Sequence, residues 1–198
     1  MLRLKEISMD NLLLIVVIAV VALLYFWYVS IVSKRNKARE ALSGIDVQLK
    51  KRNNLIPNVL AIAKRFMEHE AELLTGVTEL RTRADAGYDA ANPDAVKEHL
   101  QAASALGSQM GRLMISVEAY PDLKSDETML QAQRTYNEVE AQIAAARRFY
   151  NAAVTQLNNS VEIFPGNLLA GFAKASVMPF YETDEGSKQP VDASAFLN

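Results

Sequence analysis

Residues 12–32, with the sequence LLLIVVIAVVALLYFWYVSIV, form one apolar stretch in which Ser30 is the single clearly polar residue. A helix rises about 1.5 Å per residue, so these 21 residues reach about 31 Å and can cross a hydrocarbon core of about 30 Å. A cleaved signal peptide is the competing interpretation, but its apolar region is about 7–15 residues long and a small-residue cleavage site follows it. Because a basic cluster follows here, the stretch predicts an uncleaved transmembrane helix.

Charged residues on the two sides of this stretch predict its orientation. Two basic residues precede it and are diluted by acidic ones, whereas four basic residues crowd its C-terminal edge. The positive-inside rule therefore places the N-terminus outside and the larger C-terminal part in the cytoplasm. The basic cluster either sets topology alone or also attracts anionic lipid headgroups, by roughly 1 kcal/mol per residue. The four aromatic residues at 25–28 form one helical turn that suits the same membrane interface. Alternatively, they are ordinary residues of the span. The predicted membrane-interface residues are Tyr25, Trp27, Tyr28, Lys34, Arg35, Lys37 and Arg39.

Outside the span, the 198-residue chain has the composition of a soluble domain. Its formal net charge of -2 argues against a nucleic-acid partner, which would require a strongly basic face. The chain has no cysteine, which excludes a disulfide framework, thiol catalysis and cysteine-based zinc sites. We expect a short N-terminal segment (1–11), the span (12–32), one helical domain (33–182) and a polar tail (183–198) that becomes ordered only where Val191 or Phe196 docks.

Apolar residues after the span recur at spacings of three, four and seven in three blocks, at 38–84, 96–117 and 129–161. No strand-like alternation is sustained. The pattern predicts an all-α fold, in which the transmembrane helix continues into an antiparallel up-down bundle of three long helices. The apolar piece at 168–177 predicts a short C-terminal helix.

The predicted helix boundaries come from proline and capping residues. Pro57 removes the backbone hydrogen bond to Asn53, so a kink or break is expected near 53–56 in the first block. Asn92 followed by a proline is typical of the start of a helix. Either Ser125 or Asp126 can cap the third block.

A search for catalytic groups finds no established pattern. Neither His69 nor His99 has a metal-ligating neighbour at helical spacing, so the pairs that di-iron bundles or zinc proteases require are absent. Acidic residues beside His69 point in different directions on a helix and predict a solvated face. There is no nucleophile elbow and no glycine-rich phosphate loop. We therefore predict no catalytic residue, no cofactor site and no metal site.

The third block carries polar residues within its apolar stripe. Glu140 and Arg147 are two turns apart on one face, and if buried they need partners from this chain or from a neighbouring subunit. The stripe can fix helix register, bind another protein or a second copy, or support catalysis. An unrecognised enzyme would use Glu118, Asp122 or Glu140. The predicted polar and interaction residues of the bundle are Lys50, Arg52, Asn53, Asn58, Glu118, Tyr120, Asp122, Glu140, Arg147, Tyr150, Asn151 and Asn158.

Four strings, in order, resemble signatures of the bacterial LemA family. They are IDVQLKKRNNLIPN at 45–58, EAYPDLK at 118–124, RRFYN at 147–151 and FPGNLLAGF at 164–172. Each string alone is weakly specific, but four with matching order and spacing are specific, and the resemblance covers nearly the whole chain. Leu42 departs from the family, which often has a tryptophan there.

The resemblance implies a single-pass protein of the bacterial inner membrane with a cytoplasmic helical bundle and no established enzymatic activity. Relatives occur beside membrane metalloproteases and TPM-domain proteins, and one serves in forming a magnetosome membrane. We therefore expect a non-enzymatic scaffold that self-associates, contacts lipids and organises or shapes a membrane region. The alternative is an adaptor or regulator of a membrane metalloprotease, a TPM-domain protein or another envelope enzyme. An unrecognised enzyme is the third hypothesis.

Overall fold

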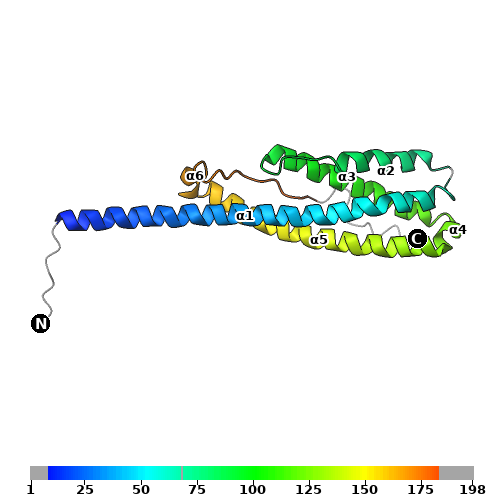
Figure 1. Cartoon of the computed structure of the whole chain (residues 1–198), viewed down its shortest axis with the longest axis horizontal. Coiled ribbons are helices and arrows are strands. Elements are labelled where there is room, and N and C mark those ends of the chain that lie inside the picture. Colours follow the sequence, from blue (N-terminus) through cyan, green and yellow to red (C-terminus); the bar gives the residue numbers. More distant parts are fainter. Residues whose placement is uncertain (1–8, 68, 183–198) are drawn as a thin grey trace, which may run out of the picture. The chain divides into compact units, whose positions relative to one another are not determined.

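The computed structural model describes residues 9–67 and 69–182, and within them the chain forms helices and no strands. This confirms the all-α prediction. Most of the expected N-terminal segment and the whole tail from 183 onward, with Val191 and Phe196, lie outside the described residues. The helices are α1 (Met9–Ala63), α2 (Ala71–Ala84), α3 (Pro93–Val117), α4 (Pro121–Ser125), α5 (Glu127–Glu162) and α6 (Gly166–Leu169) (Figure 1).

The chain divides into two compact units. We call residues 9–38 with 153–178 the anchor unit, and residues 39–152 with 179–182 the bundle unit. Helices α1 and α5 contribute residues to both. Each unit is described by itself below.

In the bundle unit, four helical segments run alternately up and down: the C-terminal part of α1, then α2, α3 and the N-terminal part of α5 (Figure 1). Helices α2 and α3 lie side by side. Apolar residues at helical spacing in α1 to α5 form a buried core cluster. Burying each large side chain contributes roughly 1.5–3 kcal/mol. Fully buried members of this cluster are Ile56, Val59, Ala63, Met67, Val77, Leu106, Met110, Leu113, Val117, Leu123 and Met129.

The break expected near 53–56 is wrong, because α1 continues through Pro57 to Ala63 and the chain leaves the helix at 64–70. Proline frees the carbonyl oxygen of Asn53. Arg81 Nε from α2 donates a hydrogen bond to that oxygen at 3.0 Å, so the freed acceptor has a new donor. The first block is therefore two helices, and the bundle has four helices where three were expected.

Two predicted helix starts are present. The Asn92 side chain accepts hydrogen bonds from the backbone nitrogens of Asp94 and Ala95, with proline at the first helical position. For α5, the structure selects Asp126, whose Oδ1 accepts from the Met129 nitrogen at 2.9 Å. An N-cap of this kind satisfies backbone donors that have no partner within the helix.

The anchor unit contains the apolar part of α1. Among the described residues, α1 is the one helix that is long and apolar enough to cross a membrane, judged by length and composition, and none of its most apolar window is buried. Near the end of this stretch Ile31 is fully buried.

The short C-terminal helix was expected at 168–177, but α6 covers only four residues, Gly166–Leu169. Turns follow to Lys174, whose φ of 47° lies in the left-handed region. There the nitrogen of Ala175 donates to the Ala170 oxygen at 3.0 Å. A left-handed residue of this kind closes the turn at 170–175 and redirects the chain there.

Candidate functional site

The guanidinium of Arg52 occupies the interior of the bundle unit, where its side chain is only 2% exposed. Its Nη2 donates to the backbone oxygen of Ala103 at 2.6 Å, and its Nη1 lies 3.3 Å from Glu140 Oε1. A Cβ at Gly107 would lie 3.0 Å from Nη1, so glycine makes room for the charged group. Glu140 thus meets a cation on α1 of the same chain, and buried charges require such a partner.

The third signature string holds the extended segment 179–182 onto α5. Asn151 donates from Nδ2 to the Tyr181 oxygen at 3.1 Å and accepts from the Tyr181 nitrogen at 2.9 Å. The Tyr150 hydroxyl donates to the Pro179 oxygen at 2.8 Å. Arg147 lies with Cζ 5.8 Å from the centre of the Tyr181 ring, a cation–π contact. Arg147 therefore contacts this segment, while Glu140 pairs with Arg52.

In the anchor unit, Asn158 makes the same kind of paired contact. Its Nδ2 donates to the Met178 oxygen and its Oδ1 accepts from the Met178 nitrogen, both at 2.9 Å. An asparagine side chain carries one acceptor and a donor group, so it can pair with one backbone residue as a neighbouring strand would. Asn151 and Asn158 are thus clamps for irregular backbone.

A polar cleft of about 340 Å³ lies in the bundle unit, lined among others by Asp46, Tyr88 and His99. The Tyr88 hydroxyl donates to Asp46 Oδ2 at 2.8 Å. The His99 ring stacks on the Tyr88 ring with centroids 4.1 Å apart, and its Nε2 lies 3.2 Å from Asp46 Oδ1. Burial is the largest cause that raises the pKa of Tyr88, and the bond to Asp46 adds to it. Tyr88 therefore stays protonated and acts as a donor.

Three further polar residues line this cleft. Lys50 Nζ lies 2.7 Å from Asp85 Oδ1, and Asn53 Nδ2 lies 3.5 Å from the same oxygen. The hydrogen bond from Lys50 lowers the pKa of Asp85, so this carboxylate stays ionised and is not a proton donor near neutral pH. The pair is largely exposed and contributes little to stability.

Sequence reasoning missed Asp46, Asp85, Tyr88 and His99. One signal was available, because Asp46 precedes Lys50 by four residues and Asn53 by seven, which places all three on one helix face. The loop residue Tyr88 and the α3 residue His99 carry no such signal, since only the packing of α3 beside α1 brings them to that face.

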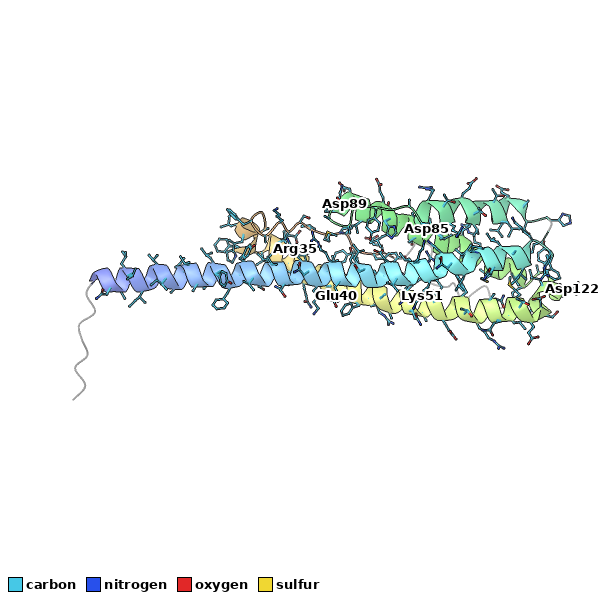
Figure 2. The ribbon with its side chains drawn as sticks, viewed as in Figure 1. Arg35, Glu40, Lys51, Asp85, Asp89 and Asp122 are labelled. Atoms are coloured by element: carbon cyan, nitrogen blue, oxygen red, sulfur yellow. The ribbon has the colours of Figure 1, made fainter. Side chains whose placement is uncertain are left out.

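The second signature string forms one local ion pair around α4 and one contact to the residue before α2. Glu118 and Lys124 form an ion pair at the surface, and the Tyr120 hydroxyl lies 3.5 Å from Glu70 Oε1. Asp122 is exposed on α4 (Figure 2), and Asn58 is exposed on α1. A surface ion pair is weak, so this string acts mainly by shaping the turn between α3 and α5.

The residues predicted to lie at a membrane interface differ in their surroundings. Tyr25 and Tyr28 are exposed, whereas Trp27 and Lys34 are half-buried. Lys37 and, at the start of the bundle unit, Arg39 are exposed. Arg35 is half-buried and its Nη1 donates to the backbone oxygen of Ala173 at 2.7 Å (Figure 2). The last contact ties the basic cluster to the turn after α6, and nothing in the sequence pattern pointed to it.

These contacts do not form a catalytic arrangement. Glu140 and Glu118 are each paired with a cation, and the raised pKa of Tyr88 leaves it protonated. Across the described ranges, no three histidine, aspartate or glutamate side chains are grouped so that they could hold a metal ion. The polar residues of the signature strings instead join helices and clamp backbone.

Comparison with known proteins finds one family and several relatives. The model of the LemA family matches residues 41–194. Magnetosome proteins MamQ 1 and MamQ 2 of Paramagnetospirillum magneticum are each 26% identical to the chain over 182 residues, covering 80% of this chain and 67% of each relative. Magnetosome protein MamQ of Magnetospirillum gryphiswaldense is 23% identical over 202 residues, covering 90% of this chain and 74% of that protein.

Proposed function

The chain belongs to the LemA family, and from this premise we propose that it is a membrane-anchored, non-enzymatic scaffold that self-associates and organises a region of a bacterial membrane. In this proposal α1 crosses the cytoplasmic membrane once. The N-terminus lies outside and the bundle unit lies in the cytoplasm, because the basic residues that follow the apolar stretch favour the cytoplasmic side.

One observation carries the proposal: several polar side chains at or near the signature strings bind groups of the same chain, while most of the apolar stretch of α1 is exposed. Arg52, Asn151 and Asn158 each bind a group of the same chain. By contrast, none of the most apolar window of α1 is buried, although Ile31 near the end of the stretch is. Polar residues that stabilise the fold support a structural role for the protein. An exposed apolar helix of membrane length supports anchorage in a membrane.

The relatives support a structural role. Their names refer to a bacterial structure, the magnetosome, and to no reaction. An enzyme would also need a pocket with carboxylates poised for proton transfer. The carboxylate with a shifted pKa in the cleft, Asp85, is held ionised by Lys50, which is the opposite of what a general acid needs.

The test is the mass of the purified full-length protein. Light scattering and negative-stain images in two detergents with different micelle masses separate protein mass from detergent mass. We expect one assembly of several copies, with the same protein mass in both detergents and cyclic symmetry in the images. A monomer at micromolar concentration in both detergents would overturn self-association.

The adaptor hypothesis is tested in the same preparation. Crosslinking in the native membrane before purification would recover one stoichiometric foreign protein if the chain presents or regulates an enzyme. Recovery of the chain crosslinked to itself alone supports the scaffold. Recovery of a foreign protein at equal stoichiometry, without self-crosslinks, would contradict the scaffold hypothesis and support the adaptor hypothesis.

A further inference from the structure

Residues 163–177 of the anchor unit expose a run of large apolar side chains. This stretch begins directly after α5, includes α6 and the turn that follows it, and contains Lys174 as its single charged residue. Exposed contiguous apolar surface marks a site that contacts a protein or a membrane. The exposed fractions are 58% for Ile163, 72% for Phe164, 65% for Leu168, 79% for Phe172 and 44% for Val177.

Two contacts place this segment beside the end of the apolar stretch of α1. A Cβ at Gly166 would lie 3.8 Å from Ile31 Cδ1, so α6 packs on Ile31, the second-to-last residue of the stretch. Arg35 Nη1 donates to the Ala173 oxygen at 2.7 Å. Figure 1 shows α6 against α1, and Figure 2 shows Arg35 at the level of α6. The exposed apolar side chains therefore lie where α1 would leave the hydrocarbon core.

The charge around the segment matches a lipid surface. Lys34, Arg35 and Lys37 follow the apolar stretch directly, and Lys174 is exposed within the segment. No acidic residue occurs between Glu162 and Glu182. Basic groups next to exposed apolar side chains are the chemistry of elements that lie at the interface of a bilayer containing anionic lipids.

We propose that residues 163–177 insert their apolar side chains into the interface of the bilayer that α1 crosses. The protein then has a second membrane contact, about 5–10 Å deep, which fixes the rotation of α1 in the membrane. The occupant is lipid, because the segment is continuous with the lipid-facing part of α1 through Ile31 and Arg35. This inference rests on the membrane anchorage in the proposed function, and it is independent of self-association.

Tryptophan fluorescence tests the proposal, because Trp27 is the single tryptophan of the chain. The full chain is reconstituted into vesicles of phosphatidylcholine and phosphatidylglycerol, with or without bromine on the acyl chains. Native Trp27 reports on α1. In a Trp27→Phe background, Phe172→Trp and, separately, Phe164→Trp report on the segment. Ile115→Trp in the same background is the matched control, since Ile115 is 74% exposed on α3 in the bundle unit.

We expect brominated chains to quench the tryptophans at 172 and 164 by about two-fold or more, as they quench Trp27, and to leave the control at 115 unchanged. If Trp27 is quenched while 172 and 164 behave like the control, α1 is inserted and the proposal is overturned. Blue-shifted emission at 172 without quenching overturns it too, since a second protein copy would then cover the segment. An unquenched Trp27 overturns membrane anchorage and the inference together.

Discussion

The bundle unit and the anchor unit use their large apolar residues in opposite ways. In the bundle unit these residues form a closed core, and its five strongly exposed ones are scattered: Val47, Ile115, Leu130, Phe149 and Phe180. In the anchor unit a few are buried, such as Ile31 and Val154, but most are exposed, along the apolar stretch of α1 and again over 163–177.

The buried polar groups also differ. In the bundle unit the charged Arg52 is buried and is paired with Glu140 and the Ala103 oxygen. In the described part of the anchor unit the buried polar residues, Asn158 and Ser160, are uncharged. Both units pair an asparagine with irregular backbone, Asn151 with Tyr181 and Asn158 with Met178. The difference teaches that the bundle unit closes most of its apolar surface on itself, whereas the anchor unit leaves apolar surface exposed, which the proposed membrane would cover.

The largest effect is expected from a substitution that disrupts the bundle unit. Arg52→Ala removes the cation inside the bundle, leaves the Ala103 oxygen without its donor and opens a space beside Gly107. We expect a loss of about 3–5 kcal/mol in the free energy of unfolding, measured by chemical denaturation in detergent. Arg148→Ala, an exposed position on α5, should change it by less than about 0.5 kcal/mol. An equal effect of the two changes would contradict the role of Arg52.

A smaller effect is expected within the anchor unit from Gly166→Ala. A Cβ there runs into the backbone oxygen of Ser160, so α6 must shift, at a cost of about 1–3 kcal/mol. Hydrogen exchange of 160–175 should rise, while exchange in the bundle core stays unchanged. Gly171→Ala is the control, because a Cβ at Gly171 meets open space. Faster exchange in the bundle core would show that the units do not respond separately.

Asn158→Ala tests the clamp on the backbone of the anchor unit. It removes two hydrogen bonds to Met178 and leaves the backbone nitrogen and oxygen of Met178 without their partner. We expect this to lower the free energy of unfolding by about 1–3 kcal/mol. We expect limited proteolysis to cut near 175–178 more quickly. Asn151→Ala, which removes the equivalent pair with Tyr181, should open the bundle unit instead. If both changes expose the same cleavage site, the two clamps are not separate.

The smallest expected effect concerns alkaline pH. Burial raises the pKa of Tyr88, Tyr136, Tyr150 and Tyr181, all in the bundle unit. The unfolded tyrosine pKa is about 10. A raised folded pKa therefore contributes stability that is present below pH 10 and lost as the pH rises through the folded value.

We therefore expect the free energy of unfolding of the bundle to fall above pH 10. Tyr88→Phe should make this fall shallower, while costing about 1 kcal/mol at neutral pH through the lost bond to Asp46. Denaturation curves at pH 7–11 measure both effects. A fall that is equally steep in Tyr88→Phe would show that Tyr88 is not one of its sources.

Sequence patterns predicted the helices well and the contacts less well. Asn92 and Asp126 start helices as capping residues do, because a cap acts on its own backbone. Pro57 did not break α1, because the missing donor is supplied by Arg81 from another helix. Local rules could not foresee a donor that is 28 residues away. The same reason hid the cleft, whose lining comes from α1, a loop and α3.

The sequence by itself determined the helical class, the apolar stretch of membrane length, the basic cluster after it and the family signatures, because periodicity, length and charge order are properties of the chain. Only the tertiary structure decided that Glu140 meets Arg52, that Tyr88 and His99 close a cleft over Asp46, and that α6 packs on Ile31. Those contacts join residues far apart along the chain. They depend on which helix faces pack together, and packing of the whole chain sets that choice.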